Sequence, residues 1–296
     1  IKRDIFRTLS EITGKSPDWG TLTGVKPLKP AMNLYLDGYD FSEVEKGLSD
    51  IYMVSVGKRK LIDEILRYQI ENVPVADSNK WSIYTSVPFC PSICSYCSFG
   101  SELARGKSIL RYLPALKKEI TECGRLFSET GNSIESVYFG GGTPTSLNAM
   151  ELVSLFNSIE HSFDIKLRDM ETTVEDRLSA IKEFGVRRIS INPQSLNDET
   201  LKKIGRFHSS DDIRNAFKLA REYEFEVINS DVIAGLPDET ADDIENTIKK
   251  LIDIGANNIT VHTLSVKRGS KLKQEDPDYH LRGIREVETM LEKASN

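Results

Sequence analysis

Residues 90–97 read Cys90-Pro91-Ser92-Ile93-Cys94-Ser95-Tyr96-Cys97, and they come directly after a β-forming run, Ser82–Val87. Three of the four cysteines of the chain therefore lie within eight residues, with the spacing C-x3-C-x2-C. Three thiolates from one short loop can bind one face of a cluster. A four-iron cluster normally takes four thiolates, so three ligands would leave one iron open to a small molecule. The spacing thus predicts a [4Fe–4S] site on Cys90, Cys94 and Cys97.

Two other interpretations of these cysteines remain open on spacing alone, a zinc site and unligated core thiols. Structural zinc takes a closed set of four N or S ligands, usually paired as C-x2-C. The nearest histidine in the sequence is His161, which offers no local fourth ligand. The remaining cysteine, Cys123, falls on an apolar stripe that runs from Ile109 to Phe127, and we expect it to be a core residue.

Short β-rich runs alternate with longer helical patterns from Trp81 onward. The expected strands are Ser82–Val87, Ser136–Phe139, Glu171–Val174, Arg188–Asn192, Val227–Ile233 and Asn258–Leu264. The expected helices are Ile109–Phe127, Met150–Ile159, Arg177–Phe184, Ile213–Tyr223 and Ala241–Ile254. Six strands connected by five helices imply a parallel α/β sheet with right-handed crossovers. Because a closed barrel has eight such units, we expect an open, three-quarter barrel or a doubly wound sheet.

Residues 1–80 have a helical period instead. Ile1, Ile5, Leu9 and Ile12 form one stripe that Gly14 closes, while Trp19–Pro30 is expected to be an irregular turn. We therefore expect a small helical region over 1–80, a catalytic barrel over 81–275 and the start of a C-terminal region over 276–296. Because the chain opens on Ile1, the helical region is expected to be the end of a longer N-terminal domain.

Composition narrows the class of protein. The 296 residues carry 39 basic and 45 acidic side chains, a net charge of −6. This balance argues against a chain that coats nucleic acid or an anionic membrane. The longest charge-free run, Trp81–Ser101, holds six serines, two prolines and the three cysteines, so no membrane span is expected. Few, clustered cysteines in a long chain indicate a reduced, cytoplasmic protein rather than a disulfide framework.

Polar residues follow the ends of the expected strands. In a parallel barrel, chemistry collects on the loops that leave the C-terminal ends of the strands. The residues found there are Gly140–Thr145, Glu175, Gln194 and His262–Ser265, and the fifth strand carries Asp231 shortly before its end. Polar groups at five successive strand ends are hard to attribute to packing, and we expect them to line one pocket with the cysteine loop at its rim.

The C-x3-C-x2-C spacing at the end of a first strand resembles the radical SAM superfamily. The resemblance implies a partial (β/α)6 TIM-like barrel of the radical SAM type. It also implies that the open iron binds S-adenosylmethionine (SAM), and that reduction of the cluster cleaves the sulfonium to a 5′-deoxyadenosyl radical. Within the superfamily, Ile83–Cys90, Tyr138–Thr145 and Gly205–His208 resemble the oxygen-independent coproporphyrinogen III dehydrogenase family. Its HemZ-type branch is suggested by Trp19–Gly24, Ser190–Gln194 and Thr260–Leu264.

This family resemblance implies two bound SAM molecules and a role for each matching residue. Tyr84, Gly141 and Glu175 match residues around the cluster-bound SAM. The positions that match residues around the second SAM are Tyr96, Gly142, Thr143, Gln194, Arg206, Asp231 and Ser265. The implied partners are a tetrapyrrole substrate and an electron donor such as flavodoxin or ferredoxin. The implied activity is a radical SAM oxidoreductase that converts coproporphyrinogen III propionates to vinyls in heme biosynthesis.

The sequence departs from the family pattern at two places. The dehydrogenases carry a fourth cysteine two places after the triad, where this chain has Phe99, and the heme-chaperone branch also lacks that cysteine. Related HemZ-type sequences continue after Val-Glu with Ala-Gly-Arg-Pro-Asp, whereas Val174-Glu175 here runs straight into Asp176-Arg177. Two alternatives therefore stay open: a heme-delivery chaperone, and a radical SAM methyltransferase that acts on a tetrapyrrole.

Overall fold

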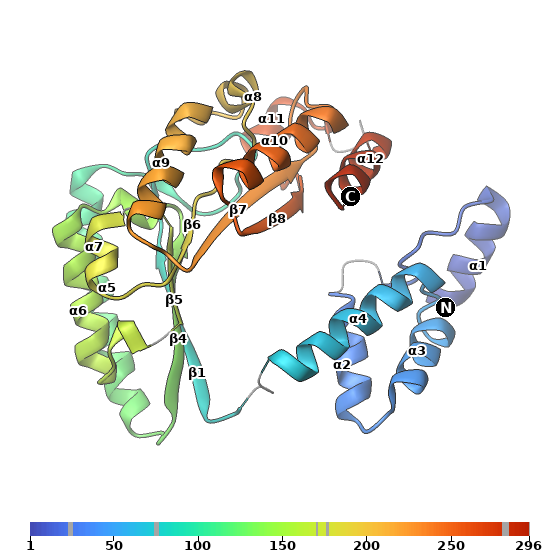
Figure 1. The fold of residues 1–296 in the computed structure, drawn as a ribbon, viewed down its shortest axis with the longest axis horizontal. Helices are drawn as coiled ribbons and strands as arrows, with labels where there is room; N and C mark the ends of the chain where they lie inside the picture. The colour runs from blue at the N-terminus through green and yellow to red at the C-terminus, as the bar shows by residue number, and fades with distance from the viewer. Residues whose placement is uncertain (23–25, 74–76, 170, 176–177, 280–283, 296) are drawn as a thin grey trace. The chain divides into compact units, whose positions relative to one another are not determined.

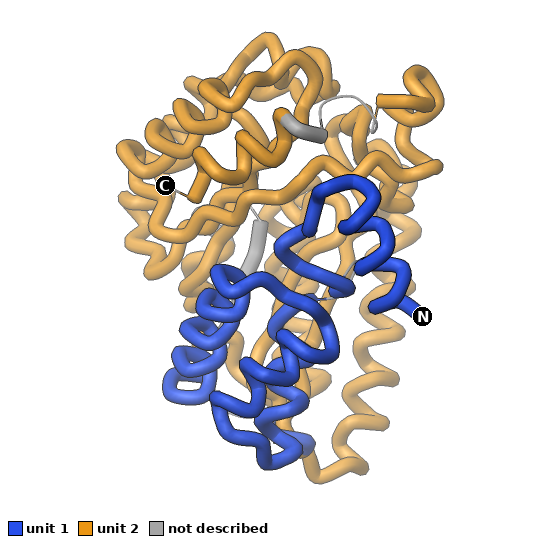
Figure 2. Tube along the Cα trace, turned by 90° about the vertical axis from the view of Figure 1, so that its right-hand side faces the viewer, with its two compact units in different colours: residues 1–78 blue, residues 79–296 orange. Residues whose placement is uncertain are grey.

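The chain forms two compact units in the computed structural model, Ile1–Ser78 and Asn79–Asn296 (Figure 2). The structure describes residues 1–22, 26–73, 77–169, 171–175, 178–279 and 284–295.

The first unit is helical. Its helices are α1 (Lys2–Thr13), α2 (Leu28–Leu36), α3 (Phe41–Asp50) and α4 (Val56–Asn72). A small apolar core joins α2, α3 and α4, and its buried members are Leu22, Ala31, Val44, Leu48, Val54, Ile62 and Leu66.

The first helix keeps its predicted apolar stripe exposed. Gly14 ends α1 in a left-handed conformation, as the sequence predicts. However, α1 has no buried residue, and Ile5 and Leu9 are each more than half exposed. The expected irregular turn over Trp19–Pro30 is shorter than predicted, because α2 already begins at Leu28. The part of that turn at 23–25 lies outside the described residues.

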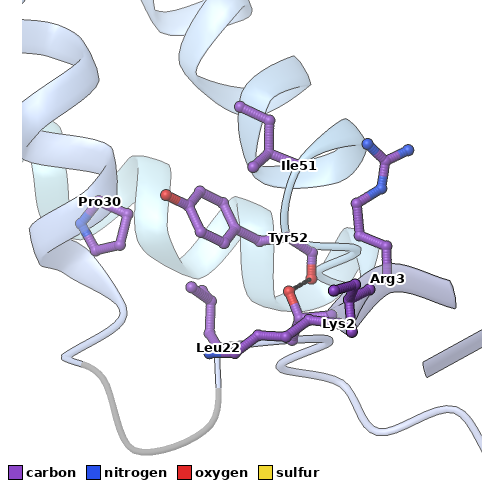
Figure 3. Close-up of a pocket in the computed structure, with 8 residues that line it drawn as sticks. Lys2, Arg3, Leu22, Pro30, Ile51 and Tyr52 are labelled. Atoms are coloured by element: carbon purple, nitrogen blue, oxygen red, sulfur yellow. Dashed lines mark hydrogen bonds between the residues drawn. The ribbon is translucent and has the colours of Figure 1, made fainter. Parts of the chain in front are cut away.

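A shallow pocket of about 400 Å3 lies in this unit (Figure 3). On its wall, the Thr21 hydroxyl donates a 3.2 Å hydrogen bond to the Tyr52 carbonyl. The lining residues are Ile1, Lys2, Arg3, Thr21, Leu22, Pro30, Ile51 and Tyr52.

A six-stranded parallel sheet forms the centre of the second unit (Figure 1). Its strands are β1 (Lys80–Val87), β4 (Ser133–Gly141), β5 (Glu171–Glu175), β6 (Arg188–Ser190), β7 (Val227–Ala234) and β8 (Asn258–Thr263). They lie side by side in the order β1-β4-β5-β6-β7-β8. This order follows the chain without a reversal, whereas a doubly wound sheet reverses at a switch point. The predicted α/β partial barrel is therefore confirmed, and the doubly wound alternative is wrong.

The helices between these strands occur where the sequence predicts them. The predicted ones are α5 (Gly106–Ser128), α6 (Ala149–Phe163), α7 (Leu178–Glu183), α9 (Ser210–Glu222) and α10 (Ala241–Ile254). Ser209 and Thr240 cap α9 and α10 through their side chains, and Gly255 ends α10 at φ 100°. Arg177, the expected start of α7, lies outside the described residues. The short helices α8 (Asp198–Lys203) and α11 (Lys271–Glu275) were not predicted, and α12 spans Ile284–Ser295.

The two faces of the sheet differ in chemistry. On one face, Phe139, Ile189 and Ile228 pack against the apolar sides of the helices in one continuous core. Alternate residues point to opposite faces of a strand. The other face accordingly carries polar positions of the same strands, among them Ser86, Ser190, Asn229 and Asn258.

The prediction that Cys123 is a core residue is wrong, because its side chain is exposed. The buried face of α5 runs through Leu116 and Ile120 to Gly124, one position further on. At Gly124 an added Cβ would lie 2.1 Å from the Ser162 carbonyl oxygen. The close approach of α6 at this glycine sets the buried face and turns Cys123 outward.

The last helix belongs to the second unit. Lys293 on α12 forms ion pairs with Asp242 and, at 2.9 Å, with Glu245 on α10.

No helix within the described ranges is both long and apolar enough to cross a bilayer.

Candidate functional site

The cysteine loop leaves the carboxyl end of β1 and is closed at its base. The short strands β2 (Phe89–Cys90) and β3 (Glu102–Leu103) pair in parallel. The Glu102 amide donates to the Pro88 carbonyl at 2.8 Å, and the Ala104 amide donates to the Cys90 carbonyl at 2.8 Å. The three predicted ligands lie within this closed loop, and Cys90, Cys94 and Cys97 are all half-buried.

The loop is anchored to two distant parts of the unit through Ser95. Its amide donates to the Ile204 carbonyl at 2.9 Å, and its carbonyl accepts from the Leu272 amide at 2.7 Å. The neighbouring Tyr96 ring packs against a small apolar cluster of Leu201, Ile204, Ile233 and Leu236. The ligand loop is therefore held by the segment after α8 and by α11.

Arg206 lies beneath the loop beside Tyr96 and Cys94. Its guanidinium donates to the Asn192 carbonyl at 2.7 Å and to the Tyr96 hydroxyl at 3.3 Å. Burial raises the pKa of Tyr96 to about 12, although the nearby Arg206 charge acts against that rise. Burial alone would lower the pKa of Arg206, but its attraction to Tyr96 and Cys94 outweighs burial and raises it. The Arg206 Nε atom is buried and, among the described residues, has no hydrogen-bond partner.

The three thiols influence one another. Burial raises the pKa of Cys97, the Phe99 amide acts against this, and the charges of Cys94 and Cys90 raise it further. Within the described ranges, no three His, Cys, Asp or Glu side chains could hold a metal ion. A structural zinc requires such a group, with its N or S ligands gathered around a single ion. In a four-iron cluster each thiolate binds a different iron, so the sulfurs need not converge on one point. Three half-buried soft donors on one loop, two of which act on the pKa of the third, fit the cluster.

The two residues after β4, Gly142 and Thr143, lie against the start of this loop. The Gly142 amide donates to the Val87 carbonyl at 2.8 Å, and the Thr143 amide to the Phe89 carbonyl at 2.7 Å. An added Cβ at Gly142 would lie 2.7 Å from the Phe89 oxygen and 2.9 Å from the Cys90 Sγ. Glycine at 142 is what lets this strand end approach the first cysteine.

Two tyrosines stack on the polar face of the sheet, Tyr84 from β1 and Tyr138 from the neighbouring strand β4. The rings of Tyr84 and Tyr138 lie 5.5 Å apart and are tilted by 13°. Tyr84 is 61% exposed. A Cβ at Gly140 would collide with the Tyr138 ring at 2.4 Å, so the glycine makes room for the pair. The structure thus adds Tyr138 beside the predicted Tyr84.

Asp231 is the centre of a polar network on the same face. Its carboxylate accepts from the Asn229 amide at 3.0 Å and lies 3.7 Å from Nε2 of His262. Its backbone amide donates to the Asn192 side chain at 3.1 Å. Asn229 and Asn192 were not predicted. The alternation of polar positions at 229 and 231 is the signal that could have found Asn229.

Gln194 occupies a left-handed backbone conformation, with φ at 68°. Its amide donates to the Asp231 carbonyl at 3.0 Å, and its carbonyl accepts from the Ile233 amide at 3.0 Å. It therefore continues the β6–β7 pairing past Pro193 as a single bridge to Val232. Such a conformation is costly for a residue with a side chain and is concentrated at functional sites.

The remaining predicted residues are placed less fully. Glu175 ends β5 in register with Ser190, and its side chain is outside what the structure describes. Ser265 follows the end of β8 and is exposed. The structure thus brings together Cys94, Tyr96 and Arg206, and separately Cys90 with Gly142.

The open parallel barrel and its three-cysteine loop define the class of protein. The chain belongs to the radical SAM superfamily, whose model matches residues 84–251. This superfamily uses a [4Fe–4S] cluster and SAM.

The chain resembles proteins of one branch of that superfamily. It is 33% identical to the oxygen-independent coproporphyrinogen-III oxidase-like protein HemZ of Bacillus subtilis, over 95% of this chain and 59% of that protein. It is 34% identical to the heme chaperone HemW of the same organism, over 63% of this chain and 51% of that protein. Its fold is similar to coproporphyrinogen III oxidase (HemN) from Escherichia coli, with a TM-score of 0.66, 25% identity, and coverage of 72% and 51%. The chain spans between about half and three fifths of the length of these relatives.

Proposed function

We propose that this chain is part of an oxygen-independent enzyme that converts propionate side chains of coproporphyrinogen III to vinyl groups. The observation that carries this proposal is the 33% identity with HemZ along 95% of the chain. Cys90, Cys94 and Cys97 would hold a cluster whose electron splits SAM into methionine and a 5′-deoxyadenosyl radical. The chemistry supplied would be removal of a hydrogen atom from a propionate β-carbon, giving 5′-deoxyadenosine, then loss of CO2 and transfer of one electron to an external one-electron acceptor, which leaves the vinyl group.

The task of the chain itself is to bind and orient. We propose that Tyr84, Gly141 and Glu175 hold the SAM at the cluster. We propose a second SAM on the residues Tyr96, Gly142, Thr143, Gln194, Arg206, Asp231 and Ser265. A guanidinium such as Arg206 holds a carboxylate through parallel N–H bonds better than an ammonium would. Its buried Nε, which has no hydrogen-bond partner in the described part of the chain, supports this role.

Basic side chains beside the cysteine loop support an anionic substrate. Lys267 and Arg268 are exposed and lie just before α11, whose Leu272 is hydrogen-bonded to Ser95 of the loop. We propose that these two side chains attract the carboxylates of the tetrapyrrole. We also propose an acidic electron carrier such as flavodoxin or ferredoxin as the donor, and a cytoplasmic location, because the cluster thiols require a reducing compartment.

One observation favours a second candidate function, a heme chaperone. Phe99 stands where the dehydrogenases carry their fourth cysteine, and its ring is 72% exposed. The chain is also 34% identical to the heme chaperone HemW over 63% of its length. In this alternative the cluster is kept but coproporphyrinogen is not decarboxylated.

Anaerobic assays separate the two functions. Cluster-loaded protein is incubated with dithionite, SAM and coproporphyrinogen III labelled in the propionate carboxyls, and released CO2 is counted. The proposal predicts labelled CO2 that depends on both SAM and dithionite. SAM cleavage without CO2 release, together with stoichiometric heme binding, would replace the dehydrogenase by the chaperone.

A further inference from the structure

Five polar residues are buried together under the site, between the ends of β6 and β7 and the starts of α8 and α10. They are Gln194, Ser195, Thr200, Glu239 and Thr247. Only Gln194 belongs to the proposed SAM residues. The group at the centre is Glu239, which is 6% exposed.

Glu239 binds two segments at once. Its carboxylate accepts a hydrogen bond from the Ser195 hydroxyl, and the Thr200 hydroxyl, on the first turn of α8, acts on the same carboxylate and lowers its pKa. Ser195 directly follows the left-handed Gln194, and its own oxygen accepts from the Asn197 amide at 3.0 Å. The carboxylate therefore joins the turn after Gln194 to helix α8.

Thr200 connects this carboxylate to the cysteine loop. Its carbonyl accepts from the Ile204 amide at 3.0 Å, and the Ile204 carbonyl in turn accepts from Ser95. The next residue in α8, Leu201, accepts through its carbonyl from the Arg206 amide at 2.9 Å. The position of α8 thus sets the position of both the Arg206 guanidinium and the anchor of the cysteine loop.

Burying the Glu239 carboxylate in this place costs free energy. Burial raises the pKa of Glu239, and the hydrogen bonds from Ser195 and Thr200 offset only part of that rise. The nearby Asp243 raises the pKa further, since it carries the same charge. A buried carboxylate next to another acid and bonded to hydroxyls adds little stability. The carboxylate instead fixes the positions of the groups to which it is hydrogen-bonded.

We infer that Glu239 is a positioning residue, which holds the strained turn at Gln194 and the segment from α8 to Arg206 in the shape that binds SAM. This inference rests on the proposed SAM site. The required property is the hydrogen-bond acceptor, so glutamine at this position should serve as well as glutamate.

Hydrogen exchange on the cluster-loaded protein tests the inference. The variants are Glu239→Met, which removes the acceptor at similar length, Glu239→Gln, which keeps it, and Ser195→Ala, which removes one donor. The same change on the outer surface of α9, Glu222→Met, is the matched control. SAM affinity is measured for each by equilibrium titration.

We expect faster exchange confined to residues 193–206 in Glu239→Met and Ser195→Ala, with SAM binding weaker by about tenfold, the effect of one lost buried hydrogen bond. Glu239→Gln and Glu222→Met should match the wild type in both. Exchange that is unchanged, or that rises evenly over the whole second unit, would overturn the inference, and so would unchanged SAM affinity. A wild-type protein that binds no SAM would overturn the proposed function instead, and the exchange pattern would still decide whether Glu239 holds this segment.

Discussion

The hydroxyl of Tyr96 accepts a hydrogen bond of 3.3 Å from the guanidinium of Arg206, a residue 110 positions further along the chain. Tyr96 lies between Cys94 and Cys97, two of the three proposed cluster ligands, and Arg206 also donates to the Asn192 carbonyl at 2.7 Å. One cation thus joins the ligand loop to the end of β6.

Tyr96→Phe should loosen the ligand loop. The change removes the acceptor of the Arg206 bond while keeping the ring in its apolar cluster, so about 1 kcal/mol of local stability is lost. We expect iron to leave the reconstituted variant several-fold faster when it is dialysed against a chelator. Tyr68→Phe, on an exposed side chain of α4, is the control. Equal rates of iron loss for the two variants would show that the bond does not hold the loop.

Gly142→Ala should block cluster assembly. The new Cβ would meet the Phe89 oxygen at 2.7 Å and the Cys90 Sγ at 2.9 Å, and the backbone oxygen cannot move away cheaply. Overpacking of this kind costs about 1–3 kcal/mol. Iron content after anaerobic reconstitution should fall well below that of the wild type. Gly106→Ala, where nothing lies within 4 Å of the new Cβ, should load normally. A fully loaded Gly142→Ala variant would contradict the proposed approach of β4 to Cys90.

The stability of the protein relative to Glu239→Gln should depend on pH. Burial raises the pKa of Glu239 above 4.5, the value of an exposed glutamate. The folded state therefore holds this proton more tightly than the unfolded state. The stability that this bound proton contributes to the folded state is fully present below pH 4.5, and it is lost as the pH rises through the pKa of Glu239 in the folded protein. The charged groups that act on this carboxylate are Asp243 and, at high pH, Tyr279.

Chemical denaturation at a series of pH values measures this difference. We expect the wild type to lose free energy of unfolding relative to Glu239→Gln as the pH rises from 4 toward neutrality. Parallel curves for the two proteins would mean that the Glu239 carboxyl titrates alike in the folded and unfolded states.

Charge reversal beside the cysteine loop should weaken substrate binding. Lys267→Glu combined with Arg268→Glu replaces two exposed cations by anions near the proposed path of a substrate with four carboxylates. We expect KM for coproporphyrinogen III to rise about tenfold at low salt, with less difference at high salt because ions screen exposed charges. SAM cleavage without substrate should not change. Arg214→Glu combined with Lys218→Glu, two exposed positions of α9, changes the net charge by the same amount and is the control, and an equal effect of that variant would refute a local role.

The cysteine loop and the strand ends could be predicted because they are local features. Residues such as Cys90 and Gly142 are recognised from spacing and from the ends of β-forming runs. The order of the strands could not be predicted, because an open barrel and a doubly wound sheet share the same alternation of elements. Cys123 shows a second limit, since helix period alone cannot decide between positions 123 and 124. The close packing of Gly124 on Ser162 in the folded protein places position 124 on the buried side of the helix and Cys123 on the exposed side.

The features that support the site, namely α8, the turn at Gln194 and Glu239, could not be predicted from the sequence for another reason. Helix α8, with six residues, is too short to show a period. The left-handed turn at Gln194 has no glycine to reveal it. Glu239 bonds a serine 44 positions away, and neither residue is distinctive on its own. Contacts of this kind become visible only when the fold brings the strand ends together.

The central claim is that Cys90, Cys94 and Cys97 hold a cluster that cleaves SAM. The most direct measurement is the amount of 5′-deoxyadenosine formed by anaerobically reconstituted protein with SAM and dithionite, for the wild type and for the variant with all three cysteines changed to alanine. We predict 5′-deoxyadenosine from the wild type, and neither bound iron nor 5′-deoxyadenosine from the variant. Equal iron binding by the two proteins, or no 5′-deoxyadenosine from a fully loaded wild type, would contradict the claim.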